Sequence, residues 1–208
     1  MKKALLFLLC IISIGYVKAY ENQFFQIDIP ENYTEEKLNG DAFKWNNGNK
    51  YMAVTVTDNS ETQYNVKYFT SVAIEKQKEY LEKNLTEGLS EYDIKVGVSD
   101  IKKVHDKETD GYYLEYTLLF PNNEKTGHPI YQKGRMYTTE HLITTIVYSS
   151  DTEIENDEEC KNVMNSLKIL DNPILGRNIN LKSFFATIII VGVILGIISA
   201  IKSEKKRQ

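Results

Sequence analysis

The sequence has few of the residues from which disulfide frameworks and metal sites are built. It contains two cysteines and three histidines in 208 residues. Cys10 lies in an apolar N-terminal run, so Cys160 is the single cysteine of the region that follows, which can form no internal disulfide. No phosphate-binding glycine loop, zinc-protease motif or hydrolase elbow is present. We therefore predict no metal, no cofactor and a domain held together by its apolar core.

Residues 1–19 have the three-part composition of a secretory signal peptide. Lys2 and Lys3 precede an apolar stretch of about twelve residues, Ala4 to Gly15, which is too short to cross a bilayer comfortably. Val17-Lys18-Ala19 places modest side chains before the expected cleavage point, with Tyr20 as the first mature residue. An uncleaved signal anchor is the alternative interpretation.

The second long apolar run, Phe184 to Ile201, contains eighteen residues and no charge. A helix of this length spans about 27 Å, which matches the hydrocarbon core of a bilayer. A buried core helix is the alternative, but such helices are rarely apolar on all faces. Gly192, Gly196 and Ala200 recur every four residues and predict helix–helix association in a homodimer, although glycine is common in membrane helices generally.

Basic residues set the expected orientation in the membrane. Four of them lie in the tail at 202–208, whereas the linker at 171–183 has two. The positive-inside rule then predicts a single-pass type I protein of the cell membrane, with residues 20–170 extracytoplasmic and the C-terminus cytoplasmic. Residues 20–181 carry 17 Lys and Arg against 28 Asp and Glu, a net charge of −11. That charge excludes nucleic acid as an expected partner.

Alternating apolar residues between 20 and 170 predict strands, interrupted by two amphipathic segments that predict helices. The fold class we expect is α+β, an antiparallel β-sheet covered by helices, plus the one C-terminal transmembrane helix. The expected strands are 25–29, 52–56, 92–104, 112–120, 130–137 and 142–150, and the expected helices are 66–85, ending at Gly88, and 153–167, capped by Asp151 or Thr152.

The stretch FFQIDIPENY at 24–33, the single long central helix and the closing NSLKIL at 165–170 resemble the PsbP-like superfamily of extracytoplasmic α/β domains. The resemblance covers most of residues 22–170. The tryptophan usual after the first proline is replaced by Tyr33. The resemblance implies accessory or binding roles and carries no catalytic residue set over to this chain.

Candidate chemistry is sparse. His105, His128 and His141 each lack a second metal ligand at a suitable spacing. The consecutive acids 157–159 are expected to fan round a helix and not to face one another. The fourteen tyrosines are expected to pack in strands, with Tyr112 and Tyr116 on one face and Tyr113 on the other, and an aromatic binding platform is the alternative.

We therefore expect a membrane-anchored accessory or ligand-binding module without catalytic activity of its own. Its expected partners are the lipid bilayer and a protein at the membrane. The alternative is a membrane-anchored hydrolase that uses Cys160 or a histidine, although Cys160 falls on the apolar face of its helix, where packing is the simpler role.

Overall fold

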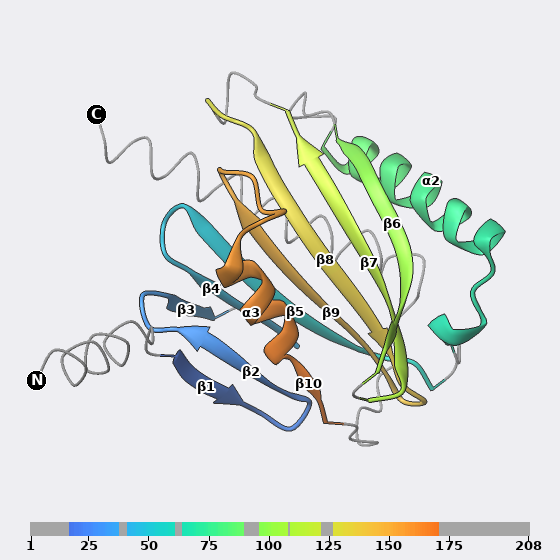
Figure 1. The fold of residues 1–208 in the computed structure, drawn as a ribbon, viewed down its shortest axis with the longest axis horizontal. Coiled ribbons are helices and arrows are strands. Elements are labelled where there is room, and N and C mark those ends of the chain that lie inside the picture. Colours follow the sequence, from blue (N-terminus) through green and yellow to red (C-terminus); the bar gives the residue numbers. More distant parts are fainter. Residues whose placement is uncertain are drawn as a thin grey trace, which may run out of the picture.

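The computed structural model describes residues 17–37, 41–60, 64–89, 96–107, 109–121 and 127–170 (Figure 1). The larger sheet has the strand order β3-β4-β5-β9-β8-β7-β6, and the smaller has the order β1-β2-β10. Every strand pair is antiparallel, which confirms the predicted antiparallel architecture with helices against it. The strands of the larger sheet are β3 (Thr34–Lys37), β4 (Ala42–Asn46), β5 (Lys50–Asp58), β6 (Gly97–Asp106), β7 (Gly111–Phe120), β8 (Ile130–Thr138) and β9 (Leu142–Ser150).

The smaller sheet consists of β1 (Val17–Glu21), β2 (Phe25–Pro30) and β10 (Lys168–Ile169). The helices are the short 3-10 helix η1 (Val66–Tyr68), α2 (Ser71–Gly88) and α3 (Glu158–Ser166). None of the helices in the described part of the chain is long and apolar enough to cross a membrane. Most of the predicted signal, the linker, the predicted span with Gly192, Gly196 and Ala200, and the basic tail lie outside the described residues.

Both predicted helices begin later than their periodicity suggests. α2 starts at Ser71 because Thr70 caps it by accepting a hydrogen bond from the Ala73 N–H, while the preceding turn is η1. The predicted start of the last helix near residue 153 and its capping by Asp151 or Thr152 are wrong. Asp157 caps α3, since its carboxylate accepts the N–H groups of Glu159 and Cys160 at 2.8 and 3.1 Å.

One face of the larger sheet packs against α3 and the smaller sheet. We call its covered part, over β4, β5 and β9, the closed half. Met52, Val54 and Ile146 are fully buried there, opposite Cys160, Val163 and Met164 of α3. At its edge an aromatic cluster joins the two sheets. The ring centroids of Tyr20 and Trp45 lie 4.9 Å apart there, and the two ring planes meet at 73°. The cluster consists of Tyr20, Phe25, Phe43 and Trp45.

The opposite face of the sheet packs against α2 and η1. Leu81 and Leu85 of α2 meet Tyr116, Leu118 and Phe120 of β7 in a second core. The ring of Tyr116 crosses Gly134 on β8 so closely that a Cβ at that glycine would collide with it. Burial on this face agrees with the predicted packing role for Tyr112 and Tyr116, which share it, whereas Tyr113 projects from the other face.

Candidate binding face and the attachment of the last helix

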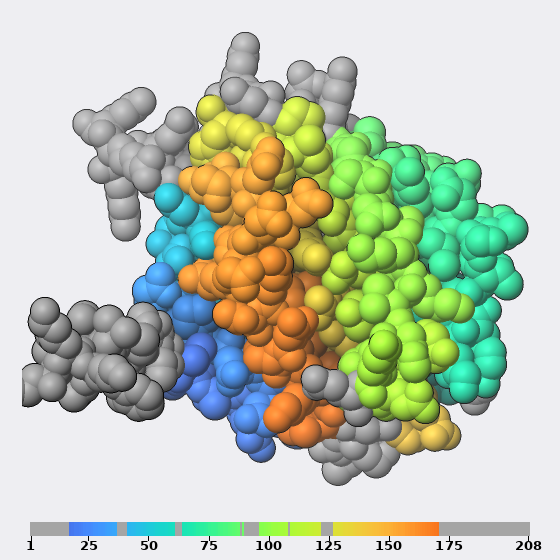
Figure 2. Space-filling model, in the orientation of Figure 1, coloured from blue at the N-terminus to red at the C-terminus, as the bar shows by residue number. Residues whose placement is uncertain are grey.

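The part of the α3-bearing face formed by β6, β7 and β8 lies beside α3, and none of the described helices packs across it. Figure 2 shows side chains of β8, in yellow, between α3 in orange and β6 and β7 in green. We call this region the open half. Its side chains follow from strand alternation and register, and they are Asp100, Lys102, Val104, Asp106, Tyr113, Glu115, Thr117, Leu119, Tyr131, Lys133, Arg135 and Tyr137. Tyr131 and Tyr137 lie next to the closed half and also pack against its core.

Glu115 is the centre of a charged cluster in the open half. Arg135 Nε donates to Glu115 Oε2 at 2.8 Å, and two ammonium groups lie near Oε1, from Lys133 at 3.3 Å and from Lys102 at 3.4 Å. Lys102 on β6 and Arg135 on β8 are the direct register partners of Glu115, and Lys133 lies two residues before Arg135 on β8. The cluster therefore holds one carboxylate among three positive charges.

The electrostatics of the cluster keep Glu115 ionised. Burial by itself raises the pKa of this carboxyl, since only 8 % of the side chain is exposed. The hydrogen bond from Arg135 and the charge of Lys133 outweigh burial, so that the pKa lies below its ordinary value. Glu115 thus neutralises one of the three cations, and positive charge remains in excess.

Arg135 joins this cluster to α3. Its Nη1 donates to the carbonyl of Met164 at 3.0 Å and to Asn165 Oδ1 at 2.9 Å, at the C-terminal end of the helix. The guanidinium also lies 4.9 Å from the ring centroid of Tyr113. Arg135 is consequently committed to contacts within the domain, whereas Lys133 and Lys102 keep 23 % and 53 % of their side chains exposed.

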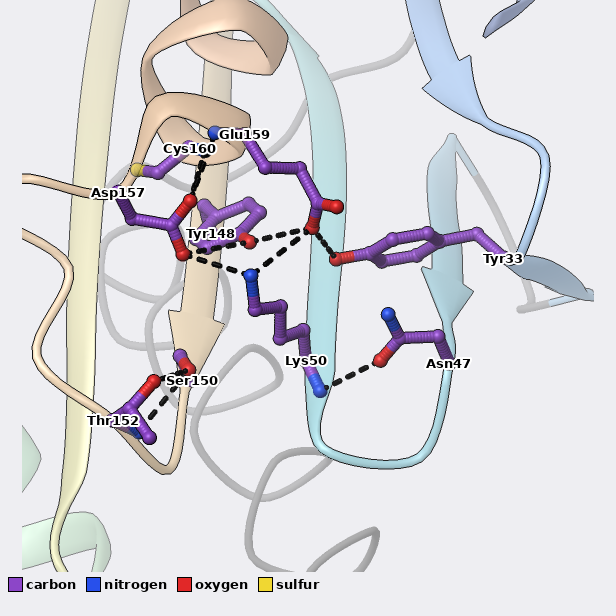
Figure 3. A network of polar contacts seen from close by, with 9 residues as sticks. All are labelled: Tyr33, Asn47, Lys50, Tyr148, Ser150, Thr152, Asp157, Glu159 and Cys160. Atoms are coloured by element: carbon purple, nitrogen blue, oxygen red, sulfur yellow. Dashed lines mark hydrogen bonds and ion pairs between the residues drawn. The ribbon is translucent and has the colours of Figure 1, made fainter. Parts of the chain in front are cut away.

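A second network fixes the N-terminal end of α3 (Figure 3). Lys50 Nζ at the start of β5 donates to Asp157 Oδ2 at 2.8 Å and lies 3.4 Å from Glu159 Oε1. Glu159 Oε1 also accepts the hydroxyls of Tyr33 and Tyr148, both at 2.8 Å. Each charged or hydroxyl group of this network has a partner within the domain. The network therefore attaches the start of α3 to β5, to β9 and to the segment between β2 and β3.

The expectation that residues 157–159 cannot share a side is wrong for Asp157 and Glu159. The reason is that Asp157 is the capping residue with an extended backbone, so the helical fan begins after it. Burial raises the pKa of Asp157, yet the hydrogen bonds from Lys50 and from the Cys160 N–H lower it below its ordinary value. Burial also raises the pKa values of Tyr33 and Tyr148, so both phenols stay protonated and donate.

The candidates for nucleophilic or metal chemistry are not brought together. Cys160 is 1 % exposed among the apolar residues of α3, and burial raises the pKa of its thiol to about 12. A thiol in that state is almost wholly protonated at neutral pH and is a poor nucleophile. His105 stacks on Tyr112 and lies 2.8 Å from Asp110, while His128 is next to the Pro129 carbonyl. Over the described ranges no three His, Cys, Asp or Glu side chains form a group suited to a metal.

Known proteins resemble this chain in structure and not in sequence. No family model matches it, and no curated protein matches its sequence. The solution structure of cyanobacterial PsbP, called CyanoP, from Synechocystis sp. PCC 6803 superposes with a TM-score of 0.53 at 11 % identity. The match covers 76 % of this chain and 95 % of CyanoP. The chain has a PsbP-like fold.

A second solved structure, of a protein from Bacteroides thetaiotaomicron, gives a TM-score of 0.42 at 12 % identity. The match covers 74 % of this chain and only 49 % of the Bacteroides protein, and its TM-score is too low to indicate a common fold. The PsbP-like resemblance predicted from the FFQIDIPENY stretch and the closing NSLKIL is thus confirmed at the level of fold. In the structure these two segments are β2 with the turn after it and the end of α3 with β10, and they pair.

The charged cluster of the open half was not singled out from the sequence. Its signal was nevertheless present, because Lys133 and Arg135 alternate with apolar or small residues in a segment predicted as a strand. Glu115 likewise stands between Leu114 and Tyr116 in the strand before it. Charges at alternate positions of an otherwise apolar strand indicate a face that the domain itself does not bury.

Proposed function

We propose that this protein is a membrane-anchored, extracytoplasmic module that binds a protein partner at the membrane and has no catalytic activity of its own. The observation that carries the proposal is the division of one sheet face into a closed half under α3 and an open half with paired but accessible charges. The apolar run at 184–201 and the N-terminal run support anchoring and export. The PsbP-like fold supports an accessory role over an enzymatic one.

Site-specific photo-crosslinking in cells tests the proposal on the full chain. A photoreactive residue in place of Leu119, which is 37 % exposed on the open half, should give one discrete adduct with a membrane-associated protein. Val72, an apolar residue of α2 that is 63 % exposed on the other side of the sheet, is the matched control and should give none. Equal adducts from both positions, or none from Leu119, would contradict a binding role for the open half.

The proposed topology has its own measurement. A cysteine introduced at Val72 should react with a membrane-impermeant maleimide in intact cells, and one introduced at Gln208 should react only after permeabilisation. Labelling of both or of neither in intact cells would overturn the single-pass arrangement. Cys160 is buried and serves as an internal check that the domain remained folded.

Self-association through the Gly192, Gly196 and Ala200 stripe remains a prediction that is separate from partner binding. Replacing Gly192 and Gly196 by isoleucine should abolish association in a membrane reporter assay, because close helix approach needs small residues. Unchanged association would remove the stripe as the cause. The hydrolase alternative predicts that Cys160→Ala abolishes cellular function, whereas a binding module keeps it.

A further inference from the structure

We propose that the open half binds an acidic segment of the partner protein, with partner carboxylates placed on Lys102 and Lys133. The proposal rests on the binding role above and adds the chemistry of the partner. It is drawn from the charge, the free donors and the shape of the open half.

The charge of the cluster around Glu115 is opposite in sign to that of the domain. Between residues 20 and 181 the net charge is −11, yet Lys102, Lys133 and Arg135 surround the single carboxylate of Glu115. Two other acids share this face by register, Asp100, 3.4 Å from Lys102 and 57 % exposed, and Asp106 at the end of β6 near Tyr113. With Asp100 counted, the cluster keeps one positive charge in excess. A cationic site in an acidic surround selects a local anionic group and repels an extended anionic surface.

The two lysines have donors to spare. An ammonium group has three N–H donors, and Lys133 has one carboxylate contact, at 3.3 Å, while Lys102 has two, both at 3.4 Å. Arg135, by comparison, is occupied by Glu115, Met164 and Asn165. Incoming carboxylates would therefore meet lysines already held in place by Glu115, at a small cost in side-chain entropy.

The surroundings of the lysines favour a chain segment over a lipid surface. Leu119 and Tyr131 are paired across β7 and β8 one row beyond Lys133, and Tyr113 and Tyr137 are paired in the row beyond Arg135. Apolar or aromatic side chains thus flank the charges on both sides along the strands. Lys133 is three-quarters buried beside α3, so a flat headgroup layer has poor access to it, whereas a single side chain of a peptide can reach it.

Fluorescence anisotropy with a defined probe tests the proposal. The probe is a labelled peptide that alternates glutamate with leucine and tyrosine, and its control carries glutamine at every glutamate. The full chain in mild detergent should bind the glutamate peptide, lose affinity as salt rises, and bind the glutamine peptide at least about tenfold more weakly.

Matched charge variants locate the binding. The double variant Lys102→Glu and Lys133→Glu should lose about tenfold or more in affinity. The control variant Lys76→Glu and Lys83→Glu changes net charge equally on the exposed side of α2 and should lose less than about threefold. A milder variant, Lys102→Gln with Lys133→Gln, guards against misfolding and should lose affinity to an intermediate extent.

Two outcomes overturn the proposal in different ways. Equal losses from the open-half and α2 variants would assign the binding to net charge. Absence of peptide binding, together with binding to phosphatidylserine vesicles that the open-half variant loses, would assign the site to anionic lipid. In either case a persisting Leu119 adduct in cells would leave the proposed function standing with a partner of different chemistry, whereas its absence would reject the proposed function itself.

Discussion

The closed and open halves belong to one face of the same sheet, the first over β4, β5 and β9 and the second over β6, β7 and β8, yet they are completed in different ways. Beneath α3 the sheet presents Met52, Val54 and Ile146, and the helix buries them. Two strands away it presents Glu115 among three cations, and no described helix covers Lys102, whose side chain is 53 % exposed. The difference teaches that one sheet face can be completed by apolar burial under a helix on one side and by a network of ion pairs on the other.

The charge networks of the two halves are also inverted in composition. At the N-terminal end of α3, two carboxylates share Lys50 and two phenols. In the open half, one carboxylate serves three cations. Both networks hold α3, one at each end, so the open half contributes to the fold as well as presenting the proposed binding face. The comparison can be tested by removing one group at a time.

The largest effect is expected from Glu115→Ala. Removing the carboxylate leaves Arg135, 11 % exposed, and Lys133 without their counter-charge, which should lower the free energy of unfolding by about 3–5 kcal/mol. Urea denaturation measures the loss, and Glu115→Gln, which can still accept the Arg135 hydrogen bond, should lose less. A loss under about 1 kcal/mol would mean that the ion pairs of the open half contribute little to the free energy of unfolding, unlike the apolar contacts of the closed half.

The next effect concerns the reverse side of the same strands. Gly134→Ala places a methyl group into the ring of Tyr116 and should cost about 1–3 kcal/mol through overpacking. Combining it with Tyr116→Leu, which removes the crossing ring, should give a double variant less destabilised than the sum of the single losses. Additive losses in thermal or urea unfolding would show that the ring can move aside, and that this face is looser than the closed half.

A smaller effect is expected from Asp157→Ala in the closed half. Loss of the α3 cap and of the Lys50 contact should cost about 0.5–2 kcal/mol. The folded pKa of Asp157 lies below its unfolded value, so this contribution is full above the unfolded pKa and is lost as the pH falls through the folded one. The gap in stability between wild type and Asp157→Ala should therefore narrow at acid pH. A gap that stays constant with pH would assign the loss to packing.

The smallest effect is expected from the part of β1 that overlaps the predicted signal. Val17, Lys18 and Ala19 are exposed, whereas Tyr20 packs in the aromatic cluster of the closed half. N-terminal sequencing should find Tyr20 first. An Ala19→Arg variant that blocks cleavage should match the wild type within about 0.5 kcal/mol, because the described residues that it retains, Val17, Lys18 and Ala19, are exposed. A larger difference would extend the closed half to these three residues.

Sequence periodicity was enough for the middle of most elements and for the fold class. The alternation in 25–29, 112–120 and 130–137 predicted β2, β7 and β8 nearly to their ends. It missed β1, β3, β4 and β10, which have two to five residues each and depend on neighbours distant in the chain. The start of α3 was misplaced because three acids in a row left several residues able to cap it.

The open half could not be assembled from the sequence because it depends on register. Lys102, Glu115 and Arg135 come from three strands joined by turns of different length, and their adjacency follows from pairing that no local pattern specifies. The register of β6 against β7 also shifts between Val98 and Asp100, and no sequence pattern predicts that shift. Alternating charges could have indicated a solvated face, but not one carboxylate among three cations.

The pairing of β1 with β2 has a consequence for the predicted removal of residues 1–19. Ala19, Lys18 and Val17 pair with Asp28, Ile29 and Pro30, so the predicted cleavage before Tyr20 would remove the strand partner from that end of β2. The newly bare margin is short. It ends at Pro30, which has no N–H to donate. The predicted cleavage would thus uncover a strand margin that is short and ends at a proline, two features that limit edge-to-edge pairing with other chains.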